Sequence, residues 1–250
     1  MDTDTYLKRI NYRGSTQPTA ETLRALHRAH LLSVPFENLD IHLNRRIVLD
    51  EAALYEKIVV NKRGGFCYEL NGLFAALLRE LGFRVTMLNS LIPENHNGCG
   101  MAFDHPILLV ELGERWILDV GFGDSYRLPL KLDERGEQMG IGVAYRISPD
   151  GDGRWKFHER LANGEWEFWY AFTLQPCLLS DFKDACIHYE TSPKSGFTQK
   201  RMCTLATPEG HITLTDDRLL VTRNGQKEET PITGEQDFVR VLNEHFGIRL

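Results

Sequence analysis

Residues 63–72 read Arg-Gly-Gly-Phe-Cys-Tyr-Glu-Leu-Asn-Gly and place Cys67 just after a glycine pair. From this cysteine onward the apolar residues recur at helical spacing, and Gly82 stands where a helix would end: Leu70, Phe74, Leu77, Leu78 and Leu81. The pattern predicts a strongly amphipathic helix that begins at Cys67. Because unpaired N–H groups and the helix dipole concentrate positive charge at a helix start, we expect the pKa of the Cys67 thiol to be lowered. Cys67 is therefore a candidate nucleophile.

Length and composition are those of an ordinary globular protein. The chain has 250 residues, of which 42% are hydrophobic and 26% charged, enough for one large domain or a few small ones. The net charge of −6 argues against a nucleic-acid partner, because a phosphate-binding surface needs an excess of Lys and Arg. A local basic pocket for a small phosphorylated ligand stays open.

The start of the chain has neither the basic nor the apolar segment of a signal peptide, and no apolar run is long enough to cross a bilayer. These features predict a cytoplasmic protein without a membrane partner. The five cysteines include no Cys-x-x-Cys pair, which fits neither a disulfide framework nor a zinc site. We expect all five to be reduced, and those other than Cys67 to be small buried side chains.

Helical patterns also precede the Cys67 stretch. A threonine cap at Thr19 is followed by apolar residues at helical spacing, which predicts a helix over residues 19–32 that ends before Pro35. A second short helix is predicted over residues 50–60, with Asp50 as its cap. Residues 1–82 therefore predict a small helical bundle that carries the nucleophile.

After residue 82 the pattern changes to the alternation of strands. Strands are predicted over residues 83–89, 105–110, 116–120, 143–147, 155–160 and 166–170, with a loop over 93–100. Residues 105–110 and 116–120 are expected to form an antiparallel hairpin around Gly113, and Asn163-Gly164 is a strong turn signal between the last two strands. Residues 83–185 therefore predict a β-barrel or a strongly curved sheet.

The remaining residues mix helices and strands. Helices are expected over residues 181–189 and 234–246, and a β-meander over 211–215, 218–222 and 226–229, with turns at Asp216-Asp217 and Asn224-Gly225. Residues 186–250 are therefore predicted to form an α/β lid. The expected fold class of the whole chain is α/β (α+β).

A lone cysteine is weak evidence for chemistry, so the case depends on its partners. A thiol nucleophile is usually deprotonated by a histidine whose second ring nitrogen is held by a carboxylate or an amide. His105 and Asp119 lie on the two arms of the predicted hairpin. If Gly113 is the centre of an odd-length connection, they share one face as diagonal neighbours; a two-residue turn would put them on opposite faces. We predict the odd-length connection. A capped or core histidine is the plain alternative for His105, whereas a buried aspartate already requires a partner.

With these residues in these positions, the sequence resembles the arylamine N-acetyltransferases over nearly its whole length. Four motifs in the order of that family carry the resemblance: Val34-Pro35-Phe36-Glu37-Asn38-Leu39, Arg63-Gly64-Gly65-x-Cys67-x-x-x-Asn71-Gly72, His105 with Leu108-Leu109-Val110, and Asp119-Val120-Gly121-Phe122-Gly123. The resemblance implies a helical bundle, a β-barrel and an α/β lid. It also implies a cysteine-protease-like triad of Cys67, His105 and Asp119.

The activity implied is transfer of acetyl from acetyl-CoA to an arylamine, arylhydrazine or hydrazide nitrogen. Such a ping-pong cycle through acetyl-cysteine needs no metal and no permanently bound cofactor; acetyl-CoA is a co-substrate. A backbone N–H at the start of the Cys67 helix could supply part of an oxyanion hole. The resemblance implies a role in xenobiotic metabolism, with an arylamine or hydrazine and acetyl-CoA as small-molecule partners, and leaves the oligomeric state open.

Water must be kept from the acyl-enzyme, so an apolar pocket is expected. By resemblance, Phe36, Phe122 and Phe197 line it, and the loop that contains Gly123 lies near the CoA pyrophosphate. Plain core packing is the alternative for each phenylalanine. Glu37 and Arg63 are a candidate ion pair that supports the site.

The chain departs from the family pattern at three positions. An acid, Glu190, stands in a segment that in the family commonly begins with serine, and His105 is preceded by Asp104, where threonine is common, and followed by Pro106. The first departure concerns CoA or amine contacts, and the others concern the environment of His105.

Three other functions share some of these features. An amide synthase of a polyketide pathway would use the same triad with a different acyl carrier, and a thiol hydrolase or transglutaminase-like enzyme would transfer the acyl group elsewhere. A CoA-binding protein with a degenerate site is the non-enzyme alternative, which the intact triad positions disfavour.

Overall fold

A computed structural model describes residues 1–96, 98–123, 126–140 and 142–250. The first 80 residues are mainly helical, as predicted, in the elements α1 (Thr3–Arg9), α2 (Ala20–Leu31), α3 (Leu39–His42), α4 (Glu51–Tyr55), the π-helical turn η1 (Glu56–Val60) and α5 (Cys67–Glu80). Thr19 and Asp50 cap α2 and α4 by accepting backbone N–H groups. Helix α1 was not predicted, because it has few apolar residues of its own.

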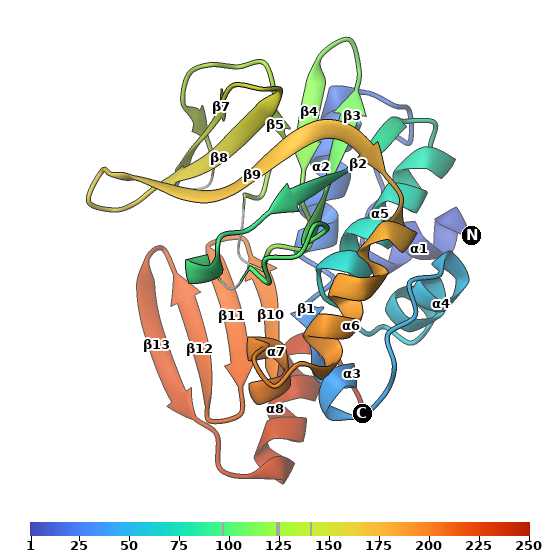
Figure 1. Cartoon of the computed structure of the whole chain (residues 1–250). Helices are drawn as coiled ribbons and strands as arrows, with labels where there is room; N and C mark the ends of the chain where they lie inside the picture. Colours follow the sequence, from blue (N-terminus) through green and yellow to red (C-terminus); the bar gives the residue numbers. More distant parts are fainter. Residues whose placement is uncertain (97, 124–125, 141) are drawn as a thin grey trace.

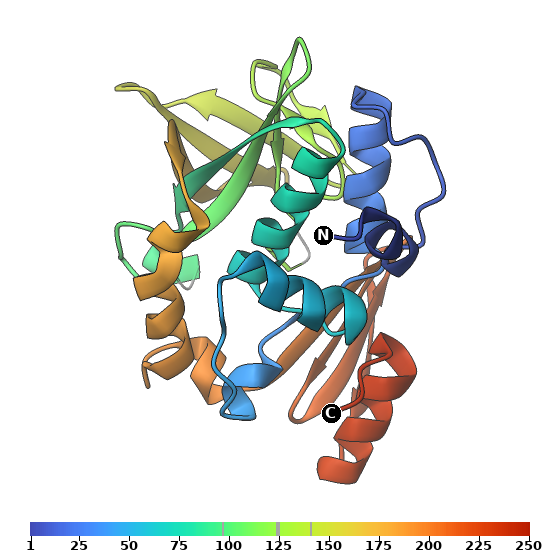
Figure 2. The same ribbon diagram turned by 90° about the vertical axis from the view of Figure 1, so that its right-hand side faces the viewer.

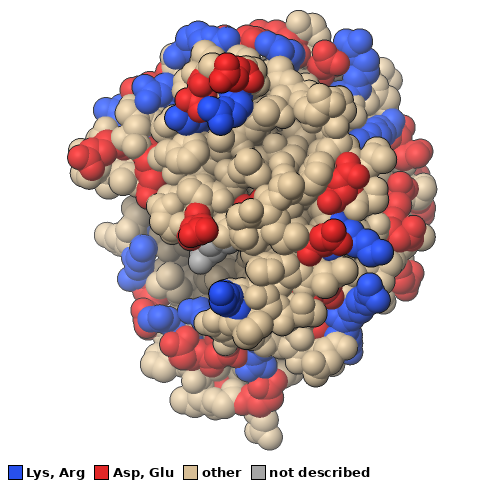
Figure 3. All heavy atoms as spheres, viewed as in Figure 1, with Lys and Arg blue, Asp and Glu red and all other residues tan. Residues whose placement is uncertain are grey.

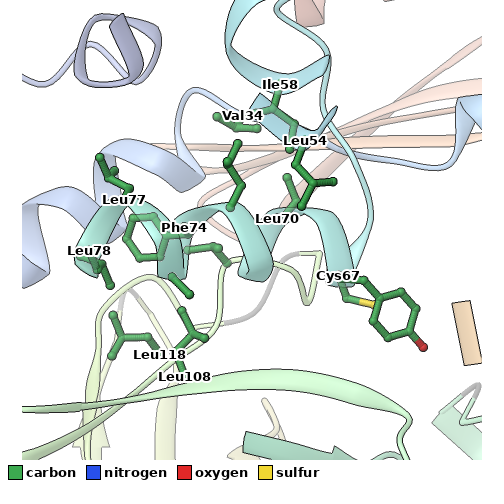
Figure 4. Close-up of a cluster of buried hydrophobic side chains, with 14 of the residues drawn as sticks. Val34, Leu54, Ile58, Cys67, Leu70, Phe74, Leu77, Leu78, Leu108 and Leu118 are labelled. Carbon is green, nitrogen blue, oxygen red and sulfur yellow. The ribbon is translucent and has the colours of Figure 1, made fainter. Parts of the chain in front are cut away.

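Helix α5 is the centre of the molecule. The sequence predicts an amphipathic helix, but every residue from Cys67 to Leu78 is buried. Leu70 and Phe74 extend from α5 among the side chains of neighbouring elements, and Leu108 and Leu118 of the adjacent hairpin lie below the same helix (Figure 4). A helix that is covered on all sides needs apolar or satisfied side chains all round, which this one has.

The middle of the chain forms an antiparallel, barrel-like sheet of eight strands in the order β5-β4-β3-β2-β9-β8-β7-β6. Its strands are β2 (Arg84–Leu91), β3 (His105–Glu111), β4 (Arg115–Leu118), β5 (Leu130–Lys131), β6 (Gln138–Met139), β7 (Ala144–Pro149), β8 (Arg154–Arg160) and β9 (Trp166–Cys177). The short 3-10 turn η2 (Glu94–His96) lies within the predicted loop, whose residue 97 is outside the described residues. β9 continues seven residues beyond the predicted end at 170, so that it pairs with both β8 and β2.

The two edge strands of this sheet are joined by a side chain. The amide of Gln138 on β6 accepts a hydrogen bond from the backbone N–H of Lys131 on β5 at 2.7 Å and donates one to its carbonyl at 2.8 Å. A side-chain amide thus takes the place of ladder bonds. The sheet is therefore nearly closed, which confirms the predicted barrel-like fold.

The hairpin of β3 and β4 has the predicted register. Leu108 pairs with Leu118 and Glu111 pairs with Arg115, so three residues form the connection and Gly113 is its centre. Gly113 has a φ of +81°, a conformation that glycine adopts without strain. Continuing this register past the last paired residues aligns 107 with 119, which places His105 and Asp119 on one face.

The last part of the chain is the predicted α/β region. It contains η3 (Leu179–Phe182), α6 (Lys183–Thr191), α7 (Gly196–Gln199), β10 (Met202–Thr207), β11 (Gly210–Thr215), β12 (Arg218–Arg223), β13 (Gln226–Pro231) and α8 (Glu235–Phe246). The meander over β11, β12 and β13 is confirmed, and β10, which was not predicted, extends it to β1 (Phe36–Glu37). Helix α8 packs against one face of this five-stranded sheet through a cluster that includes Leu214, Leu219, Phe238 and Leu242 (Figure 2).

The barrel-like sheet lies above the five-stranded sheet in Figure 1, with α5 and α6 beside them. The division into units at 1–82, 83–185 and 186–250 stays a prediction. The boundary after residue 185 falls inside α6. Strand β1, which comes from the N-terminal part of the chain, belongs to the sheet formed by the C-terminal part. Among the described residues, none of the helices combines the length and apolar character needed to cross a membrane.

A buried cluster of charges connects β1, α3 and α5. Arg63 lies 2.8 Å from Glu37 and 3.0 Å from Asp40, and Lys57 lies 2.7 Å from both Asp40 and Glu69. The expected ion pair of Glu37 and Arg63 is therefore present, with the Glu37 side chain fully buried. Since each buried charge depends on its partners, the cluster fixes the segment just before Cys67.

Replacing one member of this cluster should destabilise the fold strongly. Arg63→Met leaves Glu37 buried without its cation, which costs about 3 kcal/mol in the free energy of unfolding. Urea unfolding measures this value. The matched control is Arg240→Met on α8, whose partners Asp237 and Glu244 are more exposed and which should leave the unfolding midpoint unchanged. Equal effects of the two substitutions would contradict a structural role for the buried cluster.

Candidate active site

The glycine pair before Cys67 allows two segments to approach closely. A Cβ atom on Gly64 would lie 2.0 Å from the carbonyl oxygen of Pro35, and the backbone of Gly65 bonds to both Pro35 and Glu37. A larger residue at 64 could not fit, so the pair packs the Pro35-Phe36-Glu37 strand against the start of α5. Cys67, the first residue of α5, is 6% exposed and borders a pocket.

His105 and Asp119 come together as the hairpin register predicts. His105 begins β3, Asp119 follows β4, and the His105 Nε2–H donates to Asp119 Oδ2 at 2.7 Å. Asp119 is fully buried behind the histidine, and His105 borders the same pocket as Cys67. Because Asp119 holds Nε2, Nδ1 is the ring nitrogen left for proton exchange.

Asn71 belongs to the motif around Cys67, but no role was predicted for it. It lies one helical turn after Cys67 and is fully buried. Its Nδ2 donates to Asp119 Oδ1 and to the carbonyl of Pro106, both at 2.8 Å, and its Oδ1 accepts the N–H of Val120 at 3.0 Å. Asn71 therefore joins α5 to both arms of the hairpin. Its spacing of four from Cys67, on one helix face, is the signal that could have indicated this.

The segment after Asp119 is held from two further sides. The Gly121 N–H donates to Asp119 Oδ1 at 2.8 Å, and a Cβ on Gly121 would lie 2.7 Å from the Cys67 Cα, so only glycine fits there. His27 of α2 donates from Nε2 to the Asp119 carbonyl at 3.0 Å. Burial lowers the pKa of His27 to about 4, so this ring is neutral at physiological pH. Nothing in the local sequence around His27 indicated this role.

A pocket of about 340 Å³ opens beside Cys67 and His105, between the two sheets, where the face in Figure 3 is hollowed. All four predicted pocket residues line it, together with two aromatic residues that the sequence analysis missed: Phe36, Phe122, Gly123, Phe197, Trp169 and Tyr189. The rings of His105 and Phe122 lie edge to face at 5.1 Å, and those of Phe36 and Phe197 are 5.9 Å apart. The wall is mainly apolar, as expected for a site that excludes water.

The expectation of a lowered thiol pKa is wrong. Burial, followed by the negative charges of Asp119 and Asp104, raises the pKa of Cys67 well above its ordinary value. The backbone N–H of Tyr68 at the helix start lowers it, as the dipole argument expects, but by less. The loss of solvation therefore outweighs the helix terminus.

All three departures have defined positions. Glu190 accepts the backbone N–H of Ile47 at 2.7 Å, and it is not among the residues that line the pocket. Pro106 presents its carbonyl to Asn71. Asp104 lines the pocket itself, with its side chain 2.7 Å from the Tyr189 hydroxyl. In the described part of the chain, no three or more His, Cys, Asp or Glu side chains are grouped to hold a metal ion.

In this molecule a helical unit, a barrel-like sheet and a meander surround an apolar pocket. The pocket is bordered by a cysteine and by a histidine that is paired with an aspartate. This arrangement is typical of enzymes that transfer acyl groups through a thiol. A family model described as N-acetyltransferase matches residues 19–250. The arylamine N-acetyltransferase of Escherichia coli K12 is 34% identical over 97% of this chain and 87% of the relative. The pineal gland isozyme of Gallus gallus is 34% identical over 100% of this chain and 95% of the relative.

Solved structures agree with the sequence comparisons. The arylamine N-acetyltransferase from Salmonella typhimurium has a TM-score of 0.90 at 33% identity, covering 98% of this chain and 90% of the other. The Mycobacterium marinum enzyme in complex with CoA has a TM-score of 0.89 at 31% identity, covering 99% and 93%. The chain belongs to the arylamine N-acetyltransferase family. It is an acyltransferase, with acetyl-CoA as its co-substrate.

Asn71→Asp tests the link between α5 and Asp119. The substitution keeps the shape of the side chain but places a second carboxyl 2.8 Å from Asp119 Oδ1, where two negative charges repel. We expect the kcat for consumption of acetyl-CoA to fall roughly 100-fold, since the histidine partner is disturbed. The control is Asn61→Asp, at the exposed residue that follows η1, which should keep nearly full activity. An unimpaired Asn71→Asp variant would refute the positioning role of Asn71.

Proposed function

We propose that this enzyme acetylates arylamine, arylhydrazine or hydrazide nitrogens by a ping-pong mechanism through an acetyl-cysteine on Cys67. The observation that carries the proposal is the pairing of His105 with Asp119 at 2.7 Å on the wall of the pocket that also contains Cys67. The names of the relatives and the CoA complex of the Mycobacterium marinum enzyme support it. A cytoplasmic location remains a prediction from the sequence.

In the first half of the cycle, His105 Nδ1 takes the proton from the Cys67 thiol. The thiolate attacks the carbonyl carbon of the acetyl-CoA thioester and forms a tetrahedral intermediate, whose oxyanion is stabilised in part by a backbone N–H at the start of α5. The intermediate collapses with loss of the CoA thiolate, which takes the proton back from His105. The products of this half are acetyl-Cys67 and CoA, and one thioester has replaced another.

In the second half, the amine nitrogen attacks the carbonyl carbon of acetyl-Cys67. His105 Nδ1 accepts the proton that the nitrogen loses, and Asp119 stabilises the imidazolium that forms. The Cys67 thiolate then leaves, and the proton on His105 returns it to the thiol. The apolar wall that contains Phe36, Phe122 and Phe197 keeps water from competing with the amine for the thioester.

The raised pKa of Cys67 fits this division of work. Because burial disfavours a free thiolate, the proton leaves the sulfur only when His105 is there to hold it as an opposite charge. The acceptor nitrogen and the sulfur then use the same base in turn. In this proposal the Gly121-Phe122-Gly123 loop at the pocket edge lies near the CoA pyrophosphate.

The direct test combines the protein with acetyl-CoA and a panel of arylamines and hydrazines, and follows free CoA. Cys67→Ala should abolish turnover, because no other described cysteine borders the pocket. Mass spectrometry of the wild type with acetyl-CoA alone should show a single acetyl group, on Cys67.

Four results would change the assignment. A Cys67→Ala variant as active as the wild type would exclude the acetyl-cysteine. Faster peptide hydrolysis than acetyl transfer would favour the thiol hydrolase or transglutaminase-like alternative. Turnover with a polyketide acyl carrier but not with acetyl-CoA would favour the amide synthase, and binding of CoA without any turnover would favour a CoA-binding protein.

The role of His105 as the base predicts a pH dependence of Cys67 alkylation. In the wild type, iodoacetamide should react near neutral pH, because His105 accepts the thiol proton. In His105→Gln the buried thiol keeps its raised pKa, so the alkylation rate at pH 7 should fall at least about tenfold and should increase with pH in alkaline solution. Rates are read by mass spectrometry of Cys67. If the variant reacted at pH 7 as fast as the wild type, another group would have to deprotonate the thiol.

A further inference from the structure

Asp104 is a buried carboxylate in the wall of the pocket. Asp104 is 2% exposed and lines the same pocket as Cys67 and His105. Its Oδ1 accepts the Tyr189 hydroxyl at 2.7 Å and the Cys99 thiol at 3.1 Å, while its Oδ2 accepts the backbone N–H of Ile92 at 3.1 Å. Every one of these partners donates, which suits an ionised carboxylate because it can only accept.

This negative charge is fixed in place relative to the reacting atoms. The Tyr68 hydroxyl donates to the Asp104 carbonyl at 2.6 Å, and the Asp104 N–H donates to Asn89 Oδ1 at 3.0 Å. Tyr68 follows Cys67 in α5 and Asp104 precedes His105, so the carboxylate is anchored to the backbone that holds both groups. It cannot turn away when a ligand enters.

No cation balances this charge along the pocket wall. Among the described residues that line the pocket there is no lysine or arginine, and the two histidines are His96 and His105. His96 lies 3.6 Å from the carboxylate of Glu167, so its charged neighbour is an acid rather than a base. The rest of the lining is mainly apolar and aromatic, so the field of Asp104 is weakly screened inside it.

We infer that Asp104 is a specificity-determining residue, which makes the acceptor pocket select against arylamines with a negatively charged ring substituent. The inference rests on the proposed function, since it assigns the acceptor to this pocket. With the amine nitrogen at Cys67, a para carboxylate on the ring would enter the pocket that Asp104 also lines. At an effective dielectric of about 20, repulsion between unit charges about 10 Å apart lowers acceptance about tenfold. The acetyl-bearing arm of acetyl-CoA is uncharged, so the same charge does not oppose the donor.

The test compares 4-aminobenzoate with its methyl ester, which differ in charge at one position. The ratio of kcat/KM for the ester to that for the acid is measured at saturating acetyl-CoA, in the wild type and in Asp104→Asn. The ratio should fall about tenfold in the variant, because the negatively charged acid is no longer repelled by a carboxylate at residue 104. The neutral ester is not repelled in either enzyme, so its kcat/KM should not change for this reason. The difference in intrinsic reactivity between the amines cancels when the two enzymes are compared.

Tyr189→Phe is the matched control. It removes one hydrogen bond from the same carboxylate but keeps the charge, so the ratio should stay within twofold of the wild-type ratio. An unchanged ratio in Asp104→Asn would overturn the inference. A shift in Tyr189→Phe as large as in Asp104→Asn would also overturn it, because pocket shape rather than charge would then set the preference.

A measurement on the wild type does not depend on the variants or on turnover. Benzamide, which is neutral, should protect Cys67 from iodoacetamide at lower concentration than benzoate does, by about tenfold. Better protection by benzoate would contradict the charge selection. Failure of the wild type to acetylate either aminobenzoate would count against the proposed function instead, and the protection experiment would still decide whether the pocket selects against a negative charge.

Discussion

The buried carboxylate of Asp119 is the group on which the arrangement of this molecule depends. A fully buried charge is costly unless donors surround it, and here they come from different elements: His105 from β3, Asn71 from α5 and Gly121 from the loop that follows. His27 of α2 adds a bond to the carbonyl of the same residue. The helices and the barrel-like sheet are thus joined at one residue, and displacement of either would leave that charge without its partners.

The second constraint is the register of one hairpin. Strand side chains alternate between faces, so a slip of one residue between β3 and β4 would turn Asp119 away from His105 and toward the opposite face. The three-residue connection centred on Gly113, with its positive φ, fixes that register from a position well away from the pocket. Burial of Leu108 and Leu118 on the α5 side of the hairpin maintains it. The geometry of the site therefore has a local cause in the turn and a second cause in the core.

Features with local causes could be predicted from the sequence. The caps at Thr19 and Asp50, the turn at Asn163-Gly164 and the odd-length connection at Gly113 all follow from signals within a few residues. Features that depend on distant partners could not: the pairing of β10 with β1, the closure of the barrel-like sheet by Gln138, and the contacts of Asn71 and His27 with Asp119. The Cys67 pKa belongs to this second group. The helix start is visible in the sequence and favours the thiolate, but its effect is smaller than that of burial by segments far along the chain.

The raised pKa of Cys67 and the weak screening of the Asp104 charge have one physical origin, which is the mainly apolar lining of the pocket. The apolar wall that would protect an acetyl thioester from hydrolysis also removes the solvation of a thiolate, so a resting thiol is the consequence of that protection. The same wall leaves the carboxylate of Asp104 unscreened, and its negative charge further opposes ionisation of Cys67. An independent thiolate would therefore be the wrong resting state for such a site. A thiol that is activated only by proton transfer to a fixed histidine is consistent with the apolar wall, with the poor solvation of a thiolate and with the nearby charge of Asp104. The reason is that the cysteine–histidine pair gains no net charge when the proton moves.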